Sequence, residues 1–259
     1  MYLMFGDEAD KDQTAGKKFF IYGAIWCPSN SLSNLHAGIE TARKAAGYAV
    51  TDSLKSSSNS RPTDVAPEKH RELKNEVMNL AREVGNVRFC AQATLHEIAR
   101  NQPNSELVER GANTVLSRFD TFLKEQKSFG YALMDRMPIK DPYKYLKDKF
   151  QLGMEFPDKP SVRFDRIIGL GHACDGSSNL CSVADIMLGA FRYCVNEPEN
   201  PEAGKAMFPT LMSMMWKREQ GGKTYVNECG LVFRPKELKV EKHRAEYEAL
   251  IERLQGYLG

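Results

Sequence analysis

The stretch that decides the fold is Tyr2-Leu3-Met4-Phe5-Gly6-Asp7-Glu8, an apolar run that ends in two carboxylates. The run is short and is bounded by the polar segment 9–17, so it predicts a buried β-strand rather than a helix. Burial of a carboxylate is costly unless it is paired or binds a metal ion. Because strand side chains alternate, we expect Asp7 to lie on the functional face and Glu8 to point away. The alternative is a solvated acidic turn that closes a hairpin.

The rest of the sequence predicts an α/β fold. Further strands are expected at 18–26, 87–94, 131–135, 166–174 and 225–233, and helices at 33–47, 67–84, 105–126, 141–150, 180–195, 201–217 and 240–257. The short loop before the second strand favours an antiparallel hairpin. Strands followed by alternating helices and strands predict a mixed β-sheet flanked by helices. We expect one domain over residues 1–259, with a helical and strand extension at about 200–259.

Composition narrows the class of protein. A hydrophobic share of 42% and a charged share of 27% are ordinary for a globular protein, and a net charge of +2 neither requires nor excludes a local basic groove. No apolar run approaches the roughly 20 residues of a membrane span, and no secretory signal is visible. The six cysteines form no C-x-x-C pair, which favours reduced thiols in a cytoplasmic protein over a disulfide framework or a zinc site.

Two further aspartates lie at the borders of predicted apolar segments. Asp135 ends the apolar run 131–134, and alternation places it on the same strand face as Leu133. Asp185 lies inside the predicted helix 180–195, on the flank of its apolar stripe. Carboxylates from two strand ends and one helix flank favour a site for Mg²⁺, which takes oxygen ligands. Two such ions can activate a water and stabilise the leaving oxygen in phosphodiester cleavage.

Two residues near the predicted strand 166–174 have open interpretations. His172 could shuttle protons near a metal site, or it is a hydrogen-bonded histidine in a packed strand. Asp175 could add a fourth carboxylate, or it belongs to an ordinary turn.

A basic stripe on the predicted helix 141–150 also allows two interpretations. Lys140, Lys144 and Lys147 fall on one helical face, with tyrosines nearby. Such a stripe could follow a nucleic-acid backbone, or it is a solvated face. The terminal helix alternates charges of both signs, which is typical of a packing or homo-oligomer element.

Four segments, in order over about residues 2–195, resemble a known family. They are Phe5-Gly6-Asp7-Glu8 with the hairpin strand 18–26, then Ser53-Leu54-Lys55-Ser56, then Leu133-Met134-Asp135-Arg136, and finally Asp175-Gly176-Ser177-Ser178-Asn179-Leu180-Cys181-Ser182-Val183-Ala184-Asp185. Together they are similar to the domain-of-unknown-function 3800 family. That family is regarded as ribonuclease H-like, and its members are suspected of metal-dependent nuclease activity, some in defence against mobile elements such as phage.

The resemblance implies a role for each candidate residue. Asp7 would be the ligand from the first strand, and Asp135 and Asp185 would come from a later strand and a late helix. Glu8 would assist or orient the site. Lys55 would contact a phosphate or the scissile group, whereas by itself it is typical of an exposed loop lysine.

The sequence departs from the family pattern at two places. The family's Ser-Gly after the acidic pair is Ala9-Asp10 here, and the usual glutamine before Val-Ala-Asp is replaced by Cys181 or Ser182. Both departures leave the acidic residues intact.

These observations lead to one main hypothesis and two alternatives. The main hypothesis is a ribonuclease H-like nuclease with a mixed sheet, flanking helices and helical additions, in which Asp7, Asp135 and Asp185 bind Mg²⁺ or Mn²⁺ and the substrate is DNA or RNA. One alternative is a non-catalytic ribonuclease H-like module that binds a nucleic acid or a protein. The other is a transferase or hydrolase that acts on a nucleotide-like small molecule.

Overall fold

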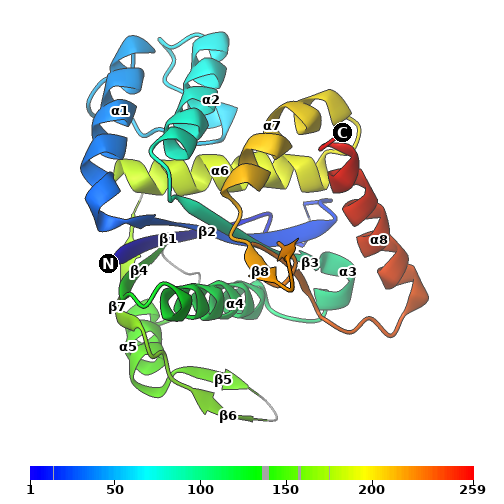
Figure 1. Ribbon diagram of the computed structural model, residues 1–259. Helices are drawn as coiled ribbons and strands as arrows, with labels where there is room; N and C mark the ends of the chain where they lie inside the picture. Colours follow the sequence, from blue (N-terminus) through cyan, green and yellow to red (C-terminus); the bar gives the residue numbers. More distant parts are fainter. Residues whose placement is uncertain (14, 136–139, 157–158, 175) are drawn as a thin grey trace.

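A central β-sheet with helices on both faces organises the chain (Figure 1). The structure is a computed structural model, and it describes residues 1–13, 15–135, 140–156, 159–174 and 176–259. The expected mixed sheet flanked by helices is confirmed. The helices and strands expected in the first 200 residues are present, with ends that differ by a few residues.

The sheet has six strands and both parallel and antiparallel pairs. In spatial order they are β10 (Leu231–Arg234), β3 (Arg88–Leu95), β2 (Phe19–Pro28), β1 (Tyr2–Ala9), β4 (Gly130–Asp135) and β7 (Ile167–Ala173). β2 is antiparallel to both β1 and β3, so the predicted hairpin is confirmed. β4 runs parallel to β1, and β7 runs parallel to β4. The C-terminal ends of β1, β4 and β7 therefore meet at one edge of the sheet.

β1 is longer than the sequence indicates. Its pairing with β2 continues through Asp7, opposite Gly23, and through Glu8, opposite Tyr22. The acidic pair therefore lies inside the strand and not in the loop after it, and both residues are half-buried. The alternative of a solvated acidic turn is wrong, because the long β2 partner extends β1 past the apolar run.

Two hydrophobic cores lie on opposite faces of the sheet. One face is covered by α1 (Leu32–Ala45), α2 (Pro67–Glu83), α6 (Asn179–Asn196), α7 (Pro201–Met214) and α8 (Glu241–Gly256). The other face is covered by α3 (His96–Ala99), α4 (Asn104–Glu125) and α5 (Pro142–Leu152). α6 and α4 lie directly against the sheet (Figure 1). Alternation within β1 fits this division, since Phe5 packs in the α6 core and Met4 packs in the α4 core.

The C-terminal part differs most from the expected pattern. The predicted strand 225–233 is wrong as one element: β9 (Lys223–Tyr225) ends at its first residue and β10 begins at Leu231, with Glu228 at a positive φ of 59° in the turn between them. The predicted helix 201–217 ends at Met214, after which the Trp216 N–H donates to Phe89 O at 3.0 Å.

Two short hairpins were not expected from the sequence. They are β5 (Met154–Phe156) with β6 (Lys159–Val162), and β8 (Arg218–Gln220) with β9. Each has strands of only three or four residues, which is too short for alternation to be visible in the sequence.

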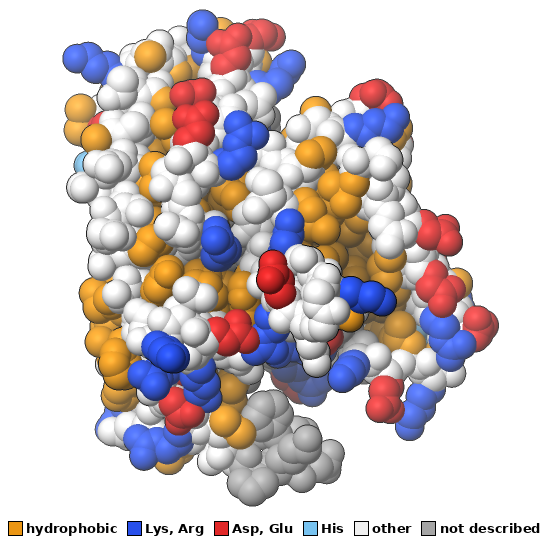
Figure 2. Space-filling view, viewed as in Figure 1, with side chains coloured by type: hydrophobic (Ala, Val, Ile, Leu, Met, Phe, Trp, Pro, Cys, Tyr) orange, Lys and Arg blue, Asp and Glu red, His pale blue; other side chains and the backbone are white. Residues whose placement is uncertain are grey.

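The surface carries both signs of charge. On the face shown in Figure 2, Lys and Arg side chains are interspersed with Asp and Glu side chains. Among the described residues, no helix has the length and apolar character needed to cross a membrane.

Candidate metal centre

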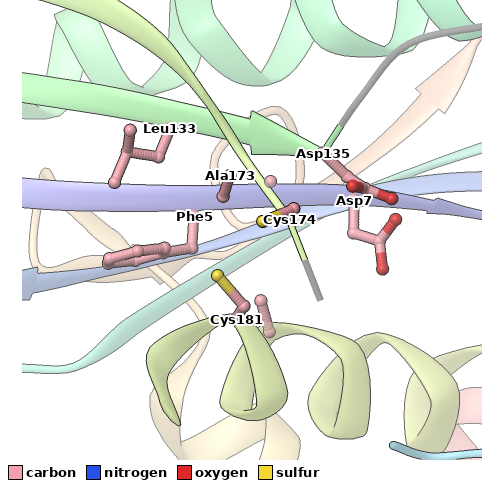
Figure 3. A pocket seen from close by; sticks show the side chains of 9 residues that line it. Phe5, Asp7, Leu133, Asp135, Ala173, Cys174 and Cys181 are labelled. Carbon is pink, nitrogen blue, oxygen red and sulfur yellow. The ribbon is translucent and has the colours of Figure 1, made fainter. Parts of the chain in front are cut away.

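Three carboxylates meet at the edge where β1 and β4 end. The last pair between these parallel strands is Gly6 with Met134, so Asp7 and Asp135 are the next residue on each strand. Figure 3 shows their carboxylates side by side at the ends of the two strands. Oxygen atoms of Asp7, Glu8 and Asp135 all lie within 4.8 Å of one another. Strand pairing therefore brings together two carboxylates that are 128 residues apart in the sequence.

Glu8 lies closer to this cluster than alternation alone predicts. Its carboxylate was expected to point away, yet it is one of the three clustered groups. The backbone N–H of Glu8 also donates to Asp7 Oδ1 at 2.7 Å, which holds the Asp7 carboxylate beside Glu8. The β1–β4 pairing ends at Gly6 with Met134, so Glu8 lies beyond it, and its carboxylate reaches the same space as those of Asp7 and Asp135.

The cluster fits a hard divalent cation. All three groups offer oxygen, the donor that Mg²⁺ prefers, and two oxygens on opposite sides of one Mg²⁺ are about 4.2 Å apart. The oxygens of Asp7, Glu8 and Asp135 lie within 4.8 Å of one another, which is close to the spacing that ligands of one cation need. Burial, followed by the charges of Glu8, Asp135 and Asp185, raises the pKa of the Asp7 carboxyl to about 8, although the hydrogen bond from the Glu8 N–H acts in the opposite direction. A bound cation would offset the free-energy cost of ionising Asp7 in this buried, acidic environment.

Lys11 is a residue of this site that the sequence did not suggest. Its Nζ donates to Glu8 Oε1 at 2.6 Å, and the Glu8 side chain is only 6% exposed. The hydrogen bond with Glu8 raises the pKa of Lys11, and the charges of Glu8, Asp135 and Asp7 act in the same direction. The loop after β1 thus places a cation beside all three carboxylates.

Asp185 faces the sheet from α6 but lies outside the cluster of three. Its charge contributes to the raised pKa of Asp7, so the two carboxylates are within electrostatic reach. Its Oδ2 accepts a hydrogen bond from the Ser56 N–H at 2.5 Å. α6 comes close to the sheet here because Gly23, the partner of Asp7 on β2, has no side chain: a Cβ there would lie 2.7 Å from Leu188 Cδ1.

Lys55 lies beside Asp185. Both residues line one small cavity, together with Ser53 and Ser182. Lys55 is half-buried, so it is not the exposed loop lysine that the segment alone indicates. The segment is held against α6 by Ser56, whose N–H bonds Asp185 and whose carbonyl oxygen accepts from Lys74 Nζ at 2.8 Å.

A second cavity connects this region to the carboxylate cluster. It is lined by Asp7 and Asp135 and by apolar or thiol side chains, of which Cys181 also lines the Lys55 cavity. Figure 3 shows Cys181 rising from α6 below the two aspartates. The two cavities therefore share Cys181 on α6; one is lined by Asp7 and Asp135, and the other by Lys55, Asp185 and two hydroxyls.

The other candidates lie elsewhere. His172 is paired with Met134, so it lies on the opposite face of the sheet from Asp135, and its Nε2 contacts Pro142 O at 3.2 Å. The structure therefore favours the hydrogen-bonded histidine over the proton shuttle. Asp175 lies outside the described residues.

The lysines of the predicted stripe on α5 are exposed, as both interpretations of the stripe require. Lys144 is exposed and pairs with Asp148 at 2.5 Å, and Lys147 is also exposed. Of the two nearby tyrosines, Tyr145 is 9% exposed and packs in the α4 core, whereas Tyr143 is 78% exposed.

Comparisons with known proteins find loose likenesses to ribonucleases H. The sequence matches no family model and no curated protein. A chain from the structure of the PCNA:RNase HII complex from Archaeoglobus fulgidus is 12% identical, with a TM-score of 0.43, and the match covers 77% of this chain and 76% of that one.

Two structures of Bst-RNase HIII are also similar. One is a mutant protein, with 13% identity and a TM-score of 0.36, and the other is a complex with Mn²⁺, with 12% identity and a TM-score of 0.38. Each match covers 83% of this chain and 64% of the RNase HIII chain, so this chain spans less than two thirds of their length. With identities and TM-scores this low, the chemistry of the site is inferred from its own residues.

Proposed function

We propose that this chain is a ribonuclease H-like nuclease that depends on Mg²⁺ or Mn²⁺ and cleaves a phosphodiester of DNA or RNA. The observation that carries the proposal is the cluster of Asp7, Glu8 and Asp135, whose oxygens lie within 4.8 Å of one another. The resemblance to the domain-of-unknown-function 3800 family supports the same reading and extends the proposal to defence against mobile elements.

Each residue of the site has a proposed role. Asp7, Asp135 and Glu8 would hold the cation, and Asp185 would face it from α6 with one oxygen already bonded to Ser56. When bound, a divalent cation supplies an activated water and stabilises the charge that develops on the phosphate. Lys55, in the adjoining cavity, would balance the charge of the phosphate, and Lys11, which is bonded to Glu8, would do the same.

A cleavage assay tests this proposal. Purified protein is incubated with Mn²⁺ and with single-stranded DNA, duplex DNA, RNA and an RNA–DNA hybrid, and the Asp7→Asn and Asp135→Asn variants are run in parallel. Asp64→Asn is the matched control, because Asp64 lies in an exposed loop. We expect cleavage of at least one substrate by the wild type and the control, and a loss of about 100-fold or more in the two site variants.

The outcomes separate the candidate functions. Wild-type protein that binds Mn²⁺ but cleaves none of the four nucleic acids would be the non-catalytic module or an enzyme acting on a small nucleotide. Cleavage that is equal in the wild type and in Asp7→Asn would come from a contaminant and would contradict the proposal.

A further inference from the structure

The residue that follows the β1 strand has an unusual backbone conformation. Asp10 comes directly after Ala9, the last residue of β1, and has a positive φ of 54°. This left-handed region is normally occupied by glycine, and aspartate is one of the few other residues that tolerate it. Its side chain is 11% exposed, which is low for a carboxylate in a loop. A buried charge in a strained backbone position is expected to have strong partners.

Those partners lie on α6. Arg192 Nε donates to both Oδ1 and Oδ2 of Asp10 at 2.8 Å, and Asn196 Nδ2 donates to Oδ2 at 2.8 Å. The Asp10 carbonyl oxygen contacts His96 Nε2 at 2.8 Å. Both the side chain and the backbone of Asp10 are therefore fixed.

The same contacts also hold the start of β2. Asn196 Oδ1 accepts from the Phe19 N–H at 3.0 Å, and its Nδ2 donates to Phe19 O at 2.8 Å. Arg192 has a second acidic neighbour in Glu197, at 3.6 Å, and Glu197 also pairs with Lys17. Asp10, Arg192 and Asn196, called the Asp10 clamp below, thus join the exit of β1 and the entry of β2 to one end of α6.

The Asp10 clamp and the carboxylate site share their two supporting elements. Asp10 is three residues after Asp7 and directly follows the last residue of β1. On α6, Arg192 is seven residues after Asp185, which is two helical turns or about 10.5 Å along the axis. The clamp is therefore close enough to control how the end of β1 lies against α6, and it makes no contact with a carboxylate of the cluster in the hydrogen bonds described above.

We propose that the Asp10 clamp is a positioning device for the metal site: it holds the end of β1 against α6 so that Asp7 and Glu8 keep the spacing to Asp135 and Asp185 that a divalent cation requires. This inference rests on the proposed function, because it concerns the same cation. Asp10 and Arg192 are positioning residues, and neither is a ligand.

The test uses two variants that break the clamp from either side. Asp10→Gly removes the carboxylate while glycine retains the positive φ, and Arg192→Ala removes the guanidinium. Arg192→Lys keeps the charge but loses the planar Nε–H donor that both Asp10 oxygens share. Arg110→Ala is the control, because Arg110 forms an exposed ion pair with Glu106 on α4. Free Mn²⁺ is counted by electron paramagnetic resonance in a titration of each full-length protein, and urea unfolding without metal is measured in the same buffer.

We expect the Mn²⁺ dissociation constant to rise about tenfold in Asp10→Gly and in Arg192→Ala, and by a smaller factor in Arg192→Lys. Loss of a residue that orients metal ligands without binding the metal typically has an effect of this size. The Arg110→Ala control should bind as the wild type does. In the cleavage assay, the Mn²⁺ concentration for half-maximal rate should rise by the same factor, while the rate at saturating Mn²⁺ returns toward that of the wild type. A general loss of stability would not produce this separation.

Two results would overturn the proposal in different ways. Folded clamp variants that bind Mn²⁺ as tightly as the wild type would remove the positioning role and leave the proposed function intact. Wild-type protein that binds no Mn²⁺ would overturn the proposed function and the clamp's role with it. If Arg192→Ala fails to fold, Asp10→Gly, which keeps the backbone conformation, decides the question.

Discussion

Asp7 is the residue at which the fold and the proposed chemistry conflict most. Its carboxyl is half-buried among other carboxylates, and burial is the main reason that its pKa rises to about 8. A fold selected only for stability would place an amide or an apolar group there. Functional sites commonly retain such unfavourable groups because their chemistry requires them.

The raised pKa predicts how stability depends on pH. The folded protein keeps the Asp7 proton up to about pH 8, whereas the unfolded chain loses it near pH 4, so between these values the folded state binds more protons. The free energy of unfolding of the metal-free protein should therefore receive a contribution from Asp7 that falls as pH rises from about 4 to about 8. Asp7→Asn should remove this loss and stabilise the metal-free protein at pH 8 by up to about 5 kcal/mol.

Urea unfolding at a series of pH values measures this effect. Asp64→Asn, an exposed aspartate, should follow the wild type. A saturating concentration of Mn²⁺ should stabilise the wild type and not Asp7→Asn. The account of Asp7 is contradicted if wild type and Asp7→Asn lose stability equally between pH 4 and pH 8.

The sequence indicates the candidate ligands better than it indicates their surroundings. Asp7 and Asp135 follow from two short apolar runs that each end in aspartate, a signal that needs no long-range information. The approach of Glu8 depends on where β4 ends, and the role of Asp10 depends on Arg192, 182 residues later. Neither can be derived from local periodicity, because both require the register between elements that are distant in the sequence.

At the scale of elements, the contact between α6 and the segment 53–56 determines where Lys55 lies. Gly189 makes this contact possible: a Cβ at that position would lie 1.8 Å from Ser56 Oγ and 2.5 Å from Ser56 Cβ. The glycine is therefore a packing requirement in a helix where alanine would otherwise be favoured.

Gly189→Ala should destabilise the protein by about 1–3 kcal/mol, although glycine to alanine in a helix usually stabilises by about 0.5–1 kcal/mol. The steric reason predicts a rescue, because Gly189→Ala combined with Ser56→Gly removes both close contacts and keeps the Ser56 N–H bond to Asp185. Gly256→Ala is the matched control, since it is helical with no atom within 4 Å of the added Cβ. Urea unfolding of the four proteins measures the effect. Equal stability of Gly189→Ala and wild type would show that 53–56 is not packed on α6 as described.

At the scale of the whole molecule, residues after 200 belong to both cores. Trp216 packs against Trp26 and Phe122 on the α4 side of the sheet, and Tyr247 packs against Phe19 on the α6 side. β10 also adds the sixth strand to the sheet, parallel to β3. The description of residues 200–259 as an extension, made from the sequence, stays a prediction, but these contacts indicate that the sheet depends on it.

A chain that ends at residue 200 should therefore lose its cooperative unfolding. It would expose several large side chains, each contributing about 1.5–3 kcal/mol of burial, against a total stability of about 5–15 kcal/mol. Near-ultraviolet circular dichroism and urea unfolding should show lost aromatic packing and no sharp transition. Removal of residues 258–259 alone, which are exposed, is the control. A sharp transition with an unchanged midpoint in the long truncation would mean that residues 1–200 fold independently.

The central claim is that Asp7 and Asp135 bind a divalent cation at the edge of the sheet, and the most direct test is a crystal of the protein grown with saturating Mn²⁺. An anomalous difference map should show a peak at the cluster, roughly 2.1 Å from a carboxylate oxygen of Asp7 and of Asp135. The peak should be absent in Asp7→Asn crystals grown in the same way. Ordered carboxylates with no anomalous peak between them in the wild-type crystal would contradict the account.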